Sequence, residues 1–171
     1  MTWNDQFLAL FERCTATYQS GDHDFENYYS AADLAFLASI GCQTREFFDF
    51  IEDFSEEGTP SASTALLIAS ARRDYFHAVQ KGIPSTRRLT RDDIPTFGEE
   101  FDGMAYFPRI HAKAQAKLCG ELDPDLMFGC GGDRNFLANH GDIPPADFLR
   151  HVWACDQDAE KLGAWVKLQN P

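Results

Sequence analysis

The segment best suited to chemistry is FGCGGDR at residues 128–134, which places three glycines directly before an expected helix. Glycines let the backbone approach a ligand closely, and the free N–H groups at a helix N-terminus attract anions. The segment matches neither a Walker loop nor a dinucleotide-binding fingerprint, so it predicts an anion site without specifying a nucleotide. In the alternative interpretation, it is a tight turn in which Asp133 caps the helix and Cys130 packs in the core.

Cys130 is also a candidate nucleophile. A helix N-terminus and Arg134 would stabilise its thiolate, and His111 or His140 could act as the base. The chain has five cysteines, an odd number without CxxC spacing, which favours reduced thiols in a cytoplasm over a disulfide framework. The histidines contain no HxxxH pair and flank no paired cysteines, so no metal site is expected, and the identity of any cofactor stays open.

Several cations could join this segment in one ligand site. Arg109, Lys113 and Lys117 are spaced i, i+4 and i+8 and therefore share one helical face. Such a group could bind a phosphate or carboxylate, because arginine offers forked donors and lysine a point charge. Alternatively, each cation belongs to a solvated polar face and pairs with a nearby acid. The predicted ligand-binding residues are Arg73, Arg109, Lys113, Gly131, Gly132, Asp133 and Arg134, and the catalytic candidates are Cys130 and His111.

The 171-residue chain carries 15 Lys and Arg against 27 Asp and Glu, a formal net charge of −12. This excess would repel phosphates, so we expect neither a nucleic-acid partner nor binding to an anionic membrane surface. Turns at Gly41 and Gly141 resemble helix-turn-helix spacing, but the helix after Gly41 is rich in acids. No stretch is long and apolar enough for a membrane span, and the N-terminus lacks signal-peptide features, so the expected location is cytoplasmic.

Helices must position these residues. Only three valines occur, and apolar residues recur at three- and four-residue steps. We therefore expect an all-α fold of about seven helices around one core, with any strands short and near Leu126–Phe128. A capping box of Thr2 and Asp5 would start the first helix. The expected helices begin near Trp3, Ser30, Thr44, Pro60, Pro108, Asp133, Pro144 and Asp156, and Asp133, Asp142 and Asp156 would cap the last three.

An internal similarity suggests duplication. Residues 33–41, DLAFLASIG, match residues 133–141, DRNFLANHG, at five of nine positions. The match predicts one domain, 1–171, built from two similar helix–loop–helix–turn–helix halves, about 1–81 and 104–171. The arginine-rich loop 82–103 would join them, and a loop of this length is often functional. Alternatively, Phe-Leu-Ala before a terminal glycine is simply favourable helix sequence.

Six strings are spread over most of the chain: FLASIGC at 36–42, RRDYF at 72–76, FPR at 107–109, KAQAKLCG at 113–120, CGGDRNFL at 130–137 and PADFL at 145–149. Together they resemble the bacterial family called "domain of unknown function 5069". The sequence departs from that family at Phe107 and Gln115, where the family has leucine and arginine, and the missing arginine weakens the predicted anion face. The resemblance implies a soluble bacterial protein and no particular activity.

Two functions from different classes follow. In the first, an enzyme or binding protein holds a small anionic ligand through Arg109, Lys113 and Arg134, while the glycine segment donates N–H groups. This function requires the side chains to converge on one cavity. The second is a non-catalytic helical interaction module that meets a basic protein partner through its acidic first half. The chain has 15 phenylalanines, and an exposed aromatic patch beside the acidic helix would favour the second function.

Overall fold

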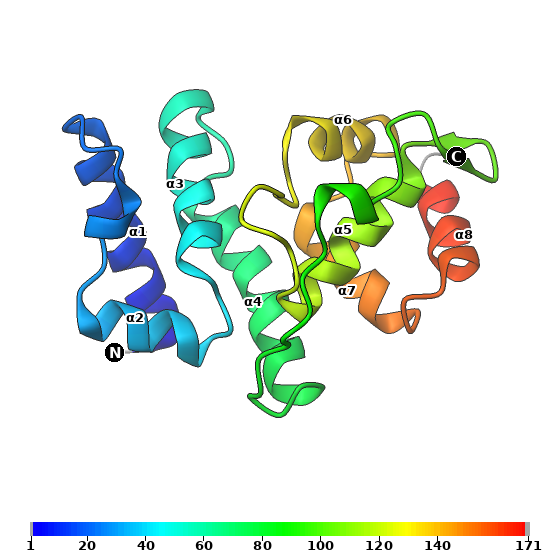
Figure 1. Cartoon of the computed structure of the whole chain (residues 1–171). Coiled ribbons are helices and arrows are strands. Elements are labelled where there is room, and N and C mark those ends of the chain that lie inside the picture. Colours follow the sequence, from blue (N-terminus) through cyan, green and yellow to red (C-terminus); the bar gives the residue numbers. More distant parts are fainter. Residues whose placement is uncertain (1, 170–171) are drawn as a thin grey trace.

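The computed structural model describes residues 2–169 and shows a mostly helical protein, as the composition predicts (Figure 1). Eight α-helices lie in this range, where about seven were expected: α1 (Trp3–Gln19), α2 (Ala31–Ser39), α3 (Thr44–Glu57), α4 (Ala62–Ala78), α5 (Phe107–Cys119), α6 (Gly131–Asn139), α7 (Pro145–Ala154) and α8 (Ala159–Gln169). The remaining elements of this range are two 3-10 helices, Phe25–Asn27 and Arg91–Asp93, and two strands, β1 (Glu100–Phe101) and β2 (Met104–Ala105).

The first two helices begin at capping boxes. The Thr2 hydroxyl accepts the Asp5 N–H at 3.2 Å while the Asp5 carboxylate accepts the Thr2 N–H at 2.8 Å, which confirms the prediction for α1. Ser30 and Asp33 make the same two bonds at the start of α2. Gly120, at φ +68°, ends α5 in the left-handed conformation that glycine adopts without strain.

Two predicted caps of later helices are wrong. Asp142 and Asp156 have φ values of +52° and +53°, so they occupy left-handed turns instead of the extended backbone that an N-cap requires. The α7 helix begins after Pro144 without a side-chain cap. The Asp158 carboxylate accepts the first-turn N–H groups of α8, at 2.9 and 3.1 Å, two residues later than predicted.

The short strands lie at residues 100–105, not at the predicted Leu126–Phe128. Asp102 and Gly103 have φ values of +52° and +77°, and two successive left-handed residues form the tight turn that joins antiparallel strands. Glu100 therefore pairs with Ala105 across the turn. The Asp-Gly pair was the sequence signature of this hairpin.

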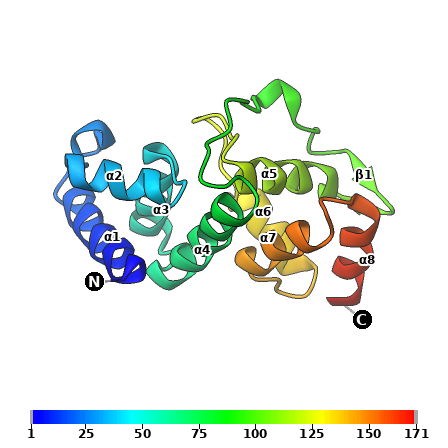
Figure 2. The same ribbon diagram turned by 90° about the horizontal axis from the view of Figure 1, so that it is seen from below.

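The α4 helix joins the two ends of the molecule. It packs against α1 on one side and against α5 and α7 on the other, while α1 packs on α3 and α5 packs on α7. Figures 1 and 2 show α1–α3 at one end, α5–α8 at the other and α4 between them. We use "first half" for the chain up to residue 81 and "second half" for residues 104 onward.

Buried phenylalanines fill the core of both halves. Phe7, Phe47 and Phe48 in the first half and Phe107 and Phe148 in the second are at most 1% exposed. Because each aromatic side chain removes a large apolar area from water, these rings supply much of the driving force for folding.

Side chains of the first half also bind the C-terminal carbonyl groups of α5. Arg72, Gln80 and Gln43 donate to the carbonyl oxygens of residues 118, 119 and 120 at 2.9, 3.0 and 3.1 Å. The last carbonyl groups of a helix receive no hydrogen bond from an N–H group of the same helix, and these three side chains supply the missing donors. The two halves are therefore joined by polar bonds as well as by apolar packing.

None of the helices within residues 2–169 combines the length and the apolar composition needed to cross a bilayer.

Candidate functional site

The glycine-rich segment meets α5 in a group of four side chains, Tyr106, Lys113, Cys130 and Asp133, which we name the Cys130 cluster. Lys113 Nζ lies 2.6 Å from Asp133 Oδ2 and 3.1 Å from Cys130 Sγ. The Tyr106 hydroxyl lies 2.9 Å from Asp133 Oδ1 and 4.0 Å from Cys130 Sγ. The structure thus brings together three residues that the sequence singled out, Lys113, Cys130 and Asp133.

Asp133 lies inside the protein, which corrects its predicted role as a helix cap. Cys130 occupies the N-cap position of α6, and the Asp133 side chain is fully buried. Its carboxylate accepts hydrogen bonds from Lys113, Tyr106 and the Gly129 N–H, the last at 2.7 Å. A buried carboxylate is tolerated only when it is paired and hydrogen-bonded, so these three donors explain why Asp133 turns inward.

Glycines allow the loop to reach this position. Gly129 has φ +98°, a conformation that side chains disfavour. A Cβ on Gly132 would lie 2.6 Å from the Tyr106 hydroxyl oxygen, so glycine is required for the tyrosine to approach α6. Gly131 is exposed, and a Cβ added there would lie 4.0 Å from the Arg134 side chain. The N–H groups of Gly131 and Gly132 belong to the first turn of α6, where no intrahelical acceptor exists.

The Cys130 sulfur lies next to two proton donors, the Lys113 ammonium and the Tyr106 hydroxyl. The Lys113 ammonium contacts both the Cys130 sulfur and the Asp133 carboxylate, and Cys130 is the N-cap residue of α6. Burial, followed by the nearby Asp133 carboxylate, raises the pKa of the Tyr106 hydroxyl, so it stays protonated and donates. Cys130 itself is partly exposed. The cluster therefore combines a partly exposed cysteine with an ammonium group and a phenol.

Arg134 turns from the same segment toward the first half. Its guanidinium donates to Asp53 Oδ2 at 3.0 Å and to the Gly129 carbonyl oxygen at 2.9 Å, and it also pairs with Glu57. Burial raises the pKa of Asp53, and the bond from Arg134 opposes that rise. Arg134 thus links the glycine-rich segment to the acidic C-terminal part of α3.

A pocket of about 330 Å³ lies between the halves beside Arg134, and we name it the inter-half pocket. Its walls come from the first turns of α4, from residues 127–129, from α6 and from residues 142–145. Most of the lining is apolar, including Pro60, Ile68, Phe128 and Leu137. Its charged residues are the cation Arg134 and the exposed Asp142. A volume of roughly 300–1,000 Å³ with an apolar lining and few polar groups is typical of small-molecule sites.

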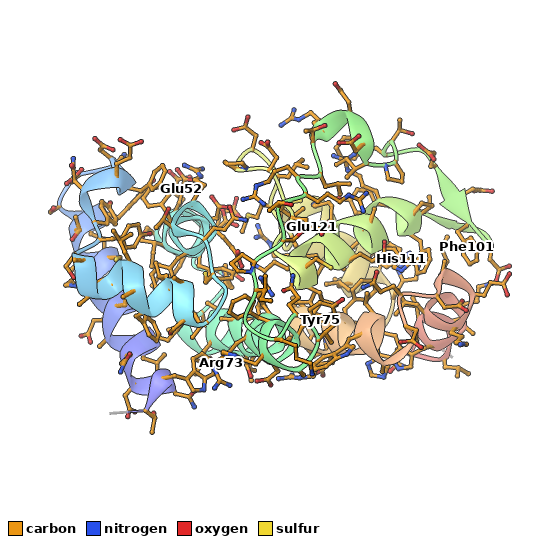
Figure 3. The ribbon with its side chains drawn as sticks, turned by 60° about the horizontal axis from the view of Figure 1, so that its bottom comes forward. Glu52, Arg73, Tyr75, Phe101, His111 and Glu121 are labelled. Carbon is orange, nitrogen blue, oxygen red and sulfur yellow. The ribbon has the colours of Figure 1, made fainter. Side chains whose placement is uncertain are left out.

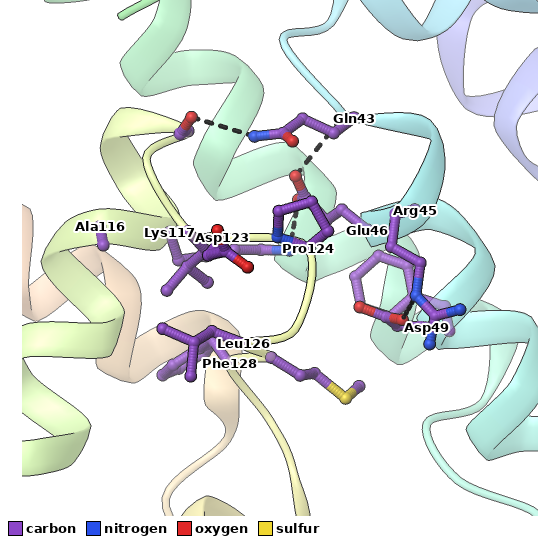
Figure 4. Close-up of a pocket in the computed structure, with 14 residues that line it drawn as sticks. Gln43, Arg45, Glu46, Asp49, Ala116, Lys117, Asp123, Pro124, Leu126 and Phe128 are labelled. Carbon is purple, nitrogen blue, oxygen red and sulfur yellow. Dashed lines mark hydrogen bonds and ion pairs between the residues drawn. The ribbon is translucent and has the colours of Figure 1, made fainter. Parts of the chain in front are cut away.

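A second cavity, between α3 and α5, is too small for such a ligand. Its free volume is about 20 Å³, enough for about one water molecule. Figure 4 shows that Lys117 pairs here with Glu46 and that Arg45 binds Asp49, with 2.9 Å between Arg45 Nε and the Asp49 oxygen. Burial raises the pKa of Asp49 to about 7, although Arg45 opposes this rise.

The other predicted arginines have partners of their own. Arg109 donates to the Pro95 carbonyl oxygen at 2.7 Å, and its guanidinium lies 4.2 Å from the centre of the Phe97 ring. Arg73 lies on α4, with its guanidinium 5.0 Å from the Trp3 ring centre (Figure 3). The cations of α5 therefore do not converge on one ligand, since each contacts a different group.

His111 also lies away from the cluster, on the part of α5 labelled in Figure 3. It precedes Lys113 by two residues, which places the two side chains on nearly opposite faces of a helix. Its Nε2 lies 3.1 Å from the Gln115 amide nitrogen, and burial lowers its pKa. His140 follows the far end of α6, with Nδ1 2.7 Å from a backbone carbonyl oxygen. The basic group at Cys130 is thus Lys113.

The sequence predicted no role for Tyr106, and it did not predict that Asp53 and Glu57 pair with Arg134. Tyr106 directly precedes the proline-containing first turn of α5, which marks a helix start but assigns no contact to the ring. Asp53 lies 81 residues before its partner Arg134. The acidic composition of α3 was visible in the sequence, but no local spacing rule pairs residues so far apart.

No group of three or more His, Cys, Asp or Glu side chains within residues 2–169 is arranged to hold a metal ion. No family model matches the chain, and no curated protein or solved structure matches it.

Proposed function

We propose that the protein binds a small organic carboxylate in the inter-half pocket, with the carboxylate on Arg134 and the apolar body between α4 and α6. The observation that carries the proposal is the position of Arg134, the cation in the lining of a mostly apolar pocket of ligand size. An arginine recognises a carboxylate through two parallel N–H bonds, and the apolar walls supply affinity for the rest of the molecule.

Arg134 is paired already, so a ligand must replace one of its partners. The Glu57 side chain is 57% exposed, whereas the Asp53 side chain is 23% exposed. An ion pair with so exposed a partner contributes little free energy, so an incoming carboxylate can displace Glu57 at low cost while Asp53 stays in place. Binding by exchange with Glu57 is therefore a specific requirement of the proposal.

The first experiment is a thermal-shift and calorimetric titration with paired probes, octanoate with octanamide and 3-phenylpropionate with its amide. A carboxylate present at about 100 times its Kd should raise Tm by about 5–10 °C, and its neutral amide should raise it less. Ala138→Phe, which fills the pocket from α6, should abolish binding of both members of each pair.

Three variants test whether Arg134 binds the carboxylate of the ligand. Arg134→Gln should remove the preference for carboxylate over amide, and Glu57→Gln should tighten carboxylate binding by removing the competitor. Arg150→Gln is the matched control, because Arg150 is a partly exposed arginine of α7 outside the pocket lining. Equal binding of carboxylate and amide by the unmodified protein would contradict the proposal.

The alternative, a protein-interaction module, depended on exposed aromatic surface. Phe97 is the single Phe, Tyr or Trp in residues 2–169 that is classed as exposed, and it packs against Tyr106 and Arg109. No aromatic patch in this range therefore lies beside the acidic end of α3 to favour a basic protein partner.

We further propose that the two halves arose by duplication. The sequence match aligns α2 with α6, which pairs α1 with α5 and α3 with α7. The packing of α1 on α3 and of α5 on α7 repeats in this alignment, and that recurrence supports the proposal. The resemblance to the bacterial family and the cytoplasmic location stay predictions from the sequence.

A further inference from the structure

We propose that hydroperoxides convert Cys130 and Lys113 into a reversible sulfur–nitrogen cross-link, which makes the Cys130 cluster an oxidative modification site. The inference goes beyond ligand binding in the inter-half pocket and rests on different side chains. It starts from a lysine ammonium group and a cysteine sulfur that are already in contact, 3.1 Å apart between Nζ and Sγ.

Cys130 and Lys113 differ in solvent exposure, and the reaction requires this difference because the oxidant must reach the cysteine while the lysine reacts only with the cysteine. Cys130 is partly exposed and adjoins the exposed Gly131, so a small oxidant can approach this residue from solvent. The Lys113 side chain is 3% exposed, so its amine is shielded from other electrophiles and faces the sulfur. The sulfur that is oxidised near the surface can therefore react with the buried Lys113 nitrogen.

The first step is oxidation of the thiol. The thiolate is the form of a cysteine that attacks peroxides, and the Lys113 ammonium lies 3.1 Å from the Cys130 sulfur. The sulfur forms a bond to one peroxide oxygen as the O–O bond breaks. Sulfur loses two electrons and becomes a sulfenic acid, and the hydroperoxide is reduced to an alcohol, or to water when it is hydrogen peroxide. The original thiol proton ends on that departing oxygen.

The second step joins sulfur to nitrogen without further electron transfer. The Lys113 ammonium gives one proton to the Asp133 carboxylate, and the free amine attacks the sulfenic sulfur. The S–N bond forms, the S–O bond breaks, and the leaving hydroxide takes a second amine hydrogen to become water. Sulfenic acids are known to condense with nitrogen in this manner. Asp133 ends protonated, so the reaction removes both charges of the buried pair together.

Cys119 provides a matched comparison within the same protein. It is also partly exposed, but its sulfur contacts the Tyr75 hydroxyl at 3.7 Å instead of an amine. Burial raises the pKa of the Cys119 thiol, which lowers its thiolate population and its reactivity. Peroxide should therefore produce an S–N link at Cys130 and none at Cys119.

Peptide mapping of the peroxide-treated full-length protein tests this directly. Free thiols are alkylated without reduction, and trypsin, which cannot cleave at a modified Lys113, should leave peptide 110–117 joined to peptide 118–134. The joined species should weigh about 2 Da less than the sum of its two peptides, and fragmentation should place the link at Cys130. Dithiothreitol should regenerate the thiol and the amine, with two reductant thiols oxidised to a disulfide.

Two variants separate the link from general oxidation. Lys113→Arg keeps a cation beside Asp133 but lacks a nucleophilic amine, so the link should disappear and a dimedone-reactive sulfenic acid should accumulate on Cys130. Cys119→Ser should leave the link unchanged. The proposal is overturned if the unmodified protein oxidises Cys130 while trypsin still releases peptide 110–113, or if the link maps to Cys119. The unmodified protein alone gives this answer, so the test does not depend on the folding of a variant.

Discussion

Two buried carboxylates, Asp133 and Asp49, are satisfied to different degrees by their neighbours. Asp133 accepts three hydrogen bonds, including one from the Lys113 ammonium. Asp49 pairs with Arg45, whose side chain is 34% exposed. Burial without enough donors favours the neutral form of a carboxyl group, and the pKa of Asp49 is accordingly raised to about 7.

This shift predicts a pH-dependent contribution of Asp49 to stability. A carboxyl group whose pKa is higher in the folded state stabilises the fold at low pH, and that contribution is lost as pH rises through the folded-state pKa. Between pH 4 and about 7, Asp49 should therefore lower the free energy of unfolding by at most about 1.4 kcal/mol per pH unit.

Urea denaturation of Asp49→Asn across this range provides the measurement. The variant lacks the titrating group, so its stability relative to the unmodified protein should increase from pH 4 to pH 7. Asp125→Asn, on an exposed loop, is the control and should show a constant difference. A flat difference for Asp49→Asn as well would show that the buried carboxyl group does not titrate in this range.

At the scale of elements, the approach of α6 to α5 depends on the absence of a side chain at Gly132. A Cβ there would meet the Tyr106 hydroxyl, whose position is fixed by its bond to Asp133. We expect Gly132→Ala to reduce the free energy of unfolding by about 1–3 kcal/mol through this overlap. Gly131→Ala, one residue away, meets only the Arg134 side chain at 4.0 Å and should change stability by less than about 1 kcal/mol.

Circular dichroism of the same two variants tests whether the Tyr106 ring moves. Displacement of the Tyr106 ring should change its near-ultraviolet circular dichroism in Gly132→Ala and leave it unchanged in Gly131→Ala. Equal stability of the two variants would mean that α6 can shift to accommodate the methyl group.

The sequence predicted the helices well because their signals are local. Thr2 with Asp5 and the glycine at residue 120 each act within one turn, and the apolar period needs no knowledge of the partner helix. The errors arose where a local residue had a non-local role. Asp133 stands where a cap is expected, yet it turns inward because Lys113, on another helix, offers it an ion pair.

The candidate site could be predicted only in part, for the same reason. Lys113, Cys130 and Asp133 were identified because glycine-rich segments and regularly spaced cations are visible in the chain. Tyr106 and the pocket beside Arg134 could not be found, because the first depends on a backbone turn at φ +71° and the second on how two halves pack. Neither leaves a pattern in residue spacing.

At the scale of the whole molecule, α4 belongs to the packing of both halves. It contacts α1 as well as α5 and α7, and the first half also supplies the side chains that bind residues 118–120. Removing either half would expose a large apolar face of α4 to water. We therefore expect the two halves to unfold in one cooperative transition.

Tryptophan positions make this testable in urea. Trp3 reports the first half, and Trp153 and Trp165 report the second. Trp3→Phe leaves probes in the second half alone, and Trp153→Phe with Trp165→Phe leaves a probe in the first half alone. In each variant the fluorescence midpoint should equal the midpoint from far-ultraviolet circular dichroism, which reports all helices. Separate midpoints would show that the halves are independent units.

The positions of α1 and α8 at opposite ends of the molecule also determine its response to mechanical load (Figures 1 and 2). A force applied between these helices acts on α4, which contacts α1 in the first half and both α5 and α7 in the second. Once α4 separates from α5 and α7, the loop 82–103 becomes the tether and can extend by about 3.3–3.6 Å per residue. Because the same separation exposes the apolar face of α4, extension of this loop and unfolding of both halves should form a single lengthening step.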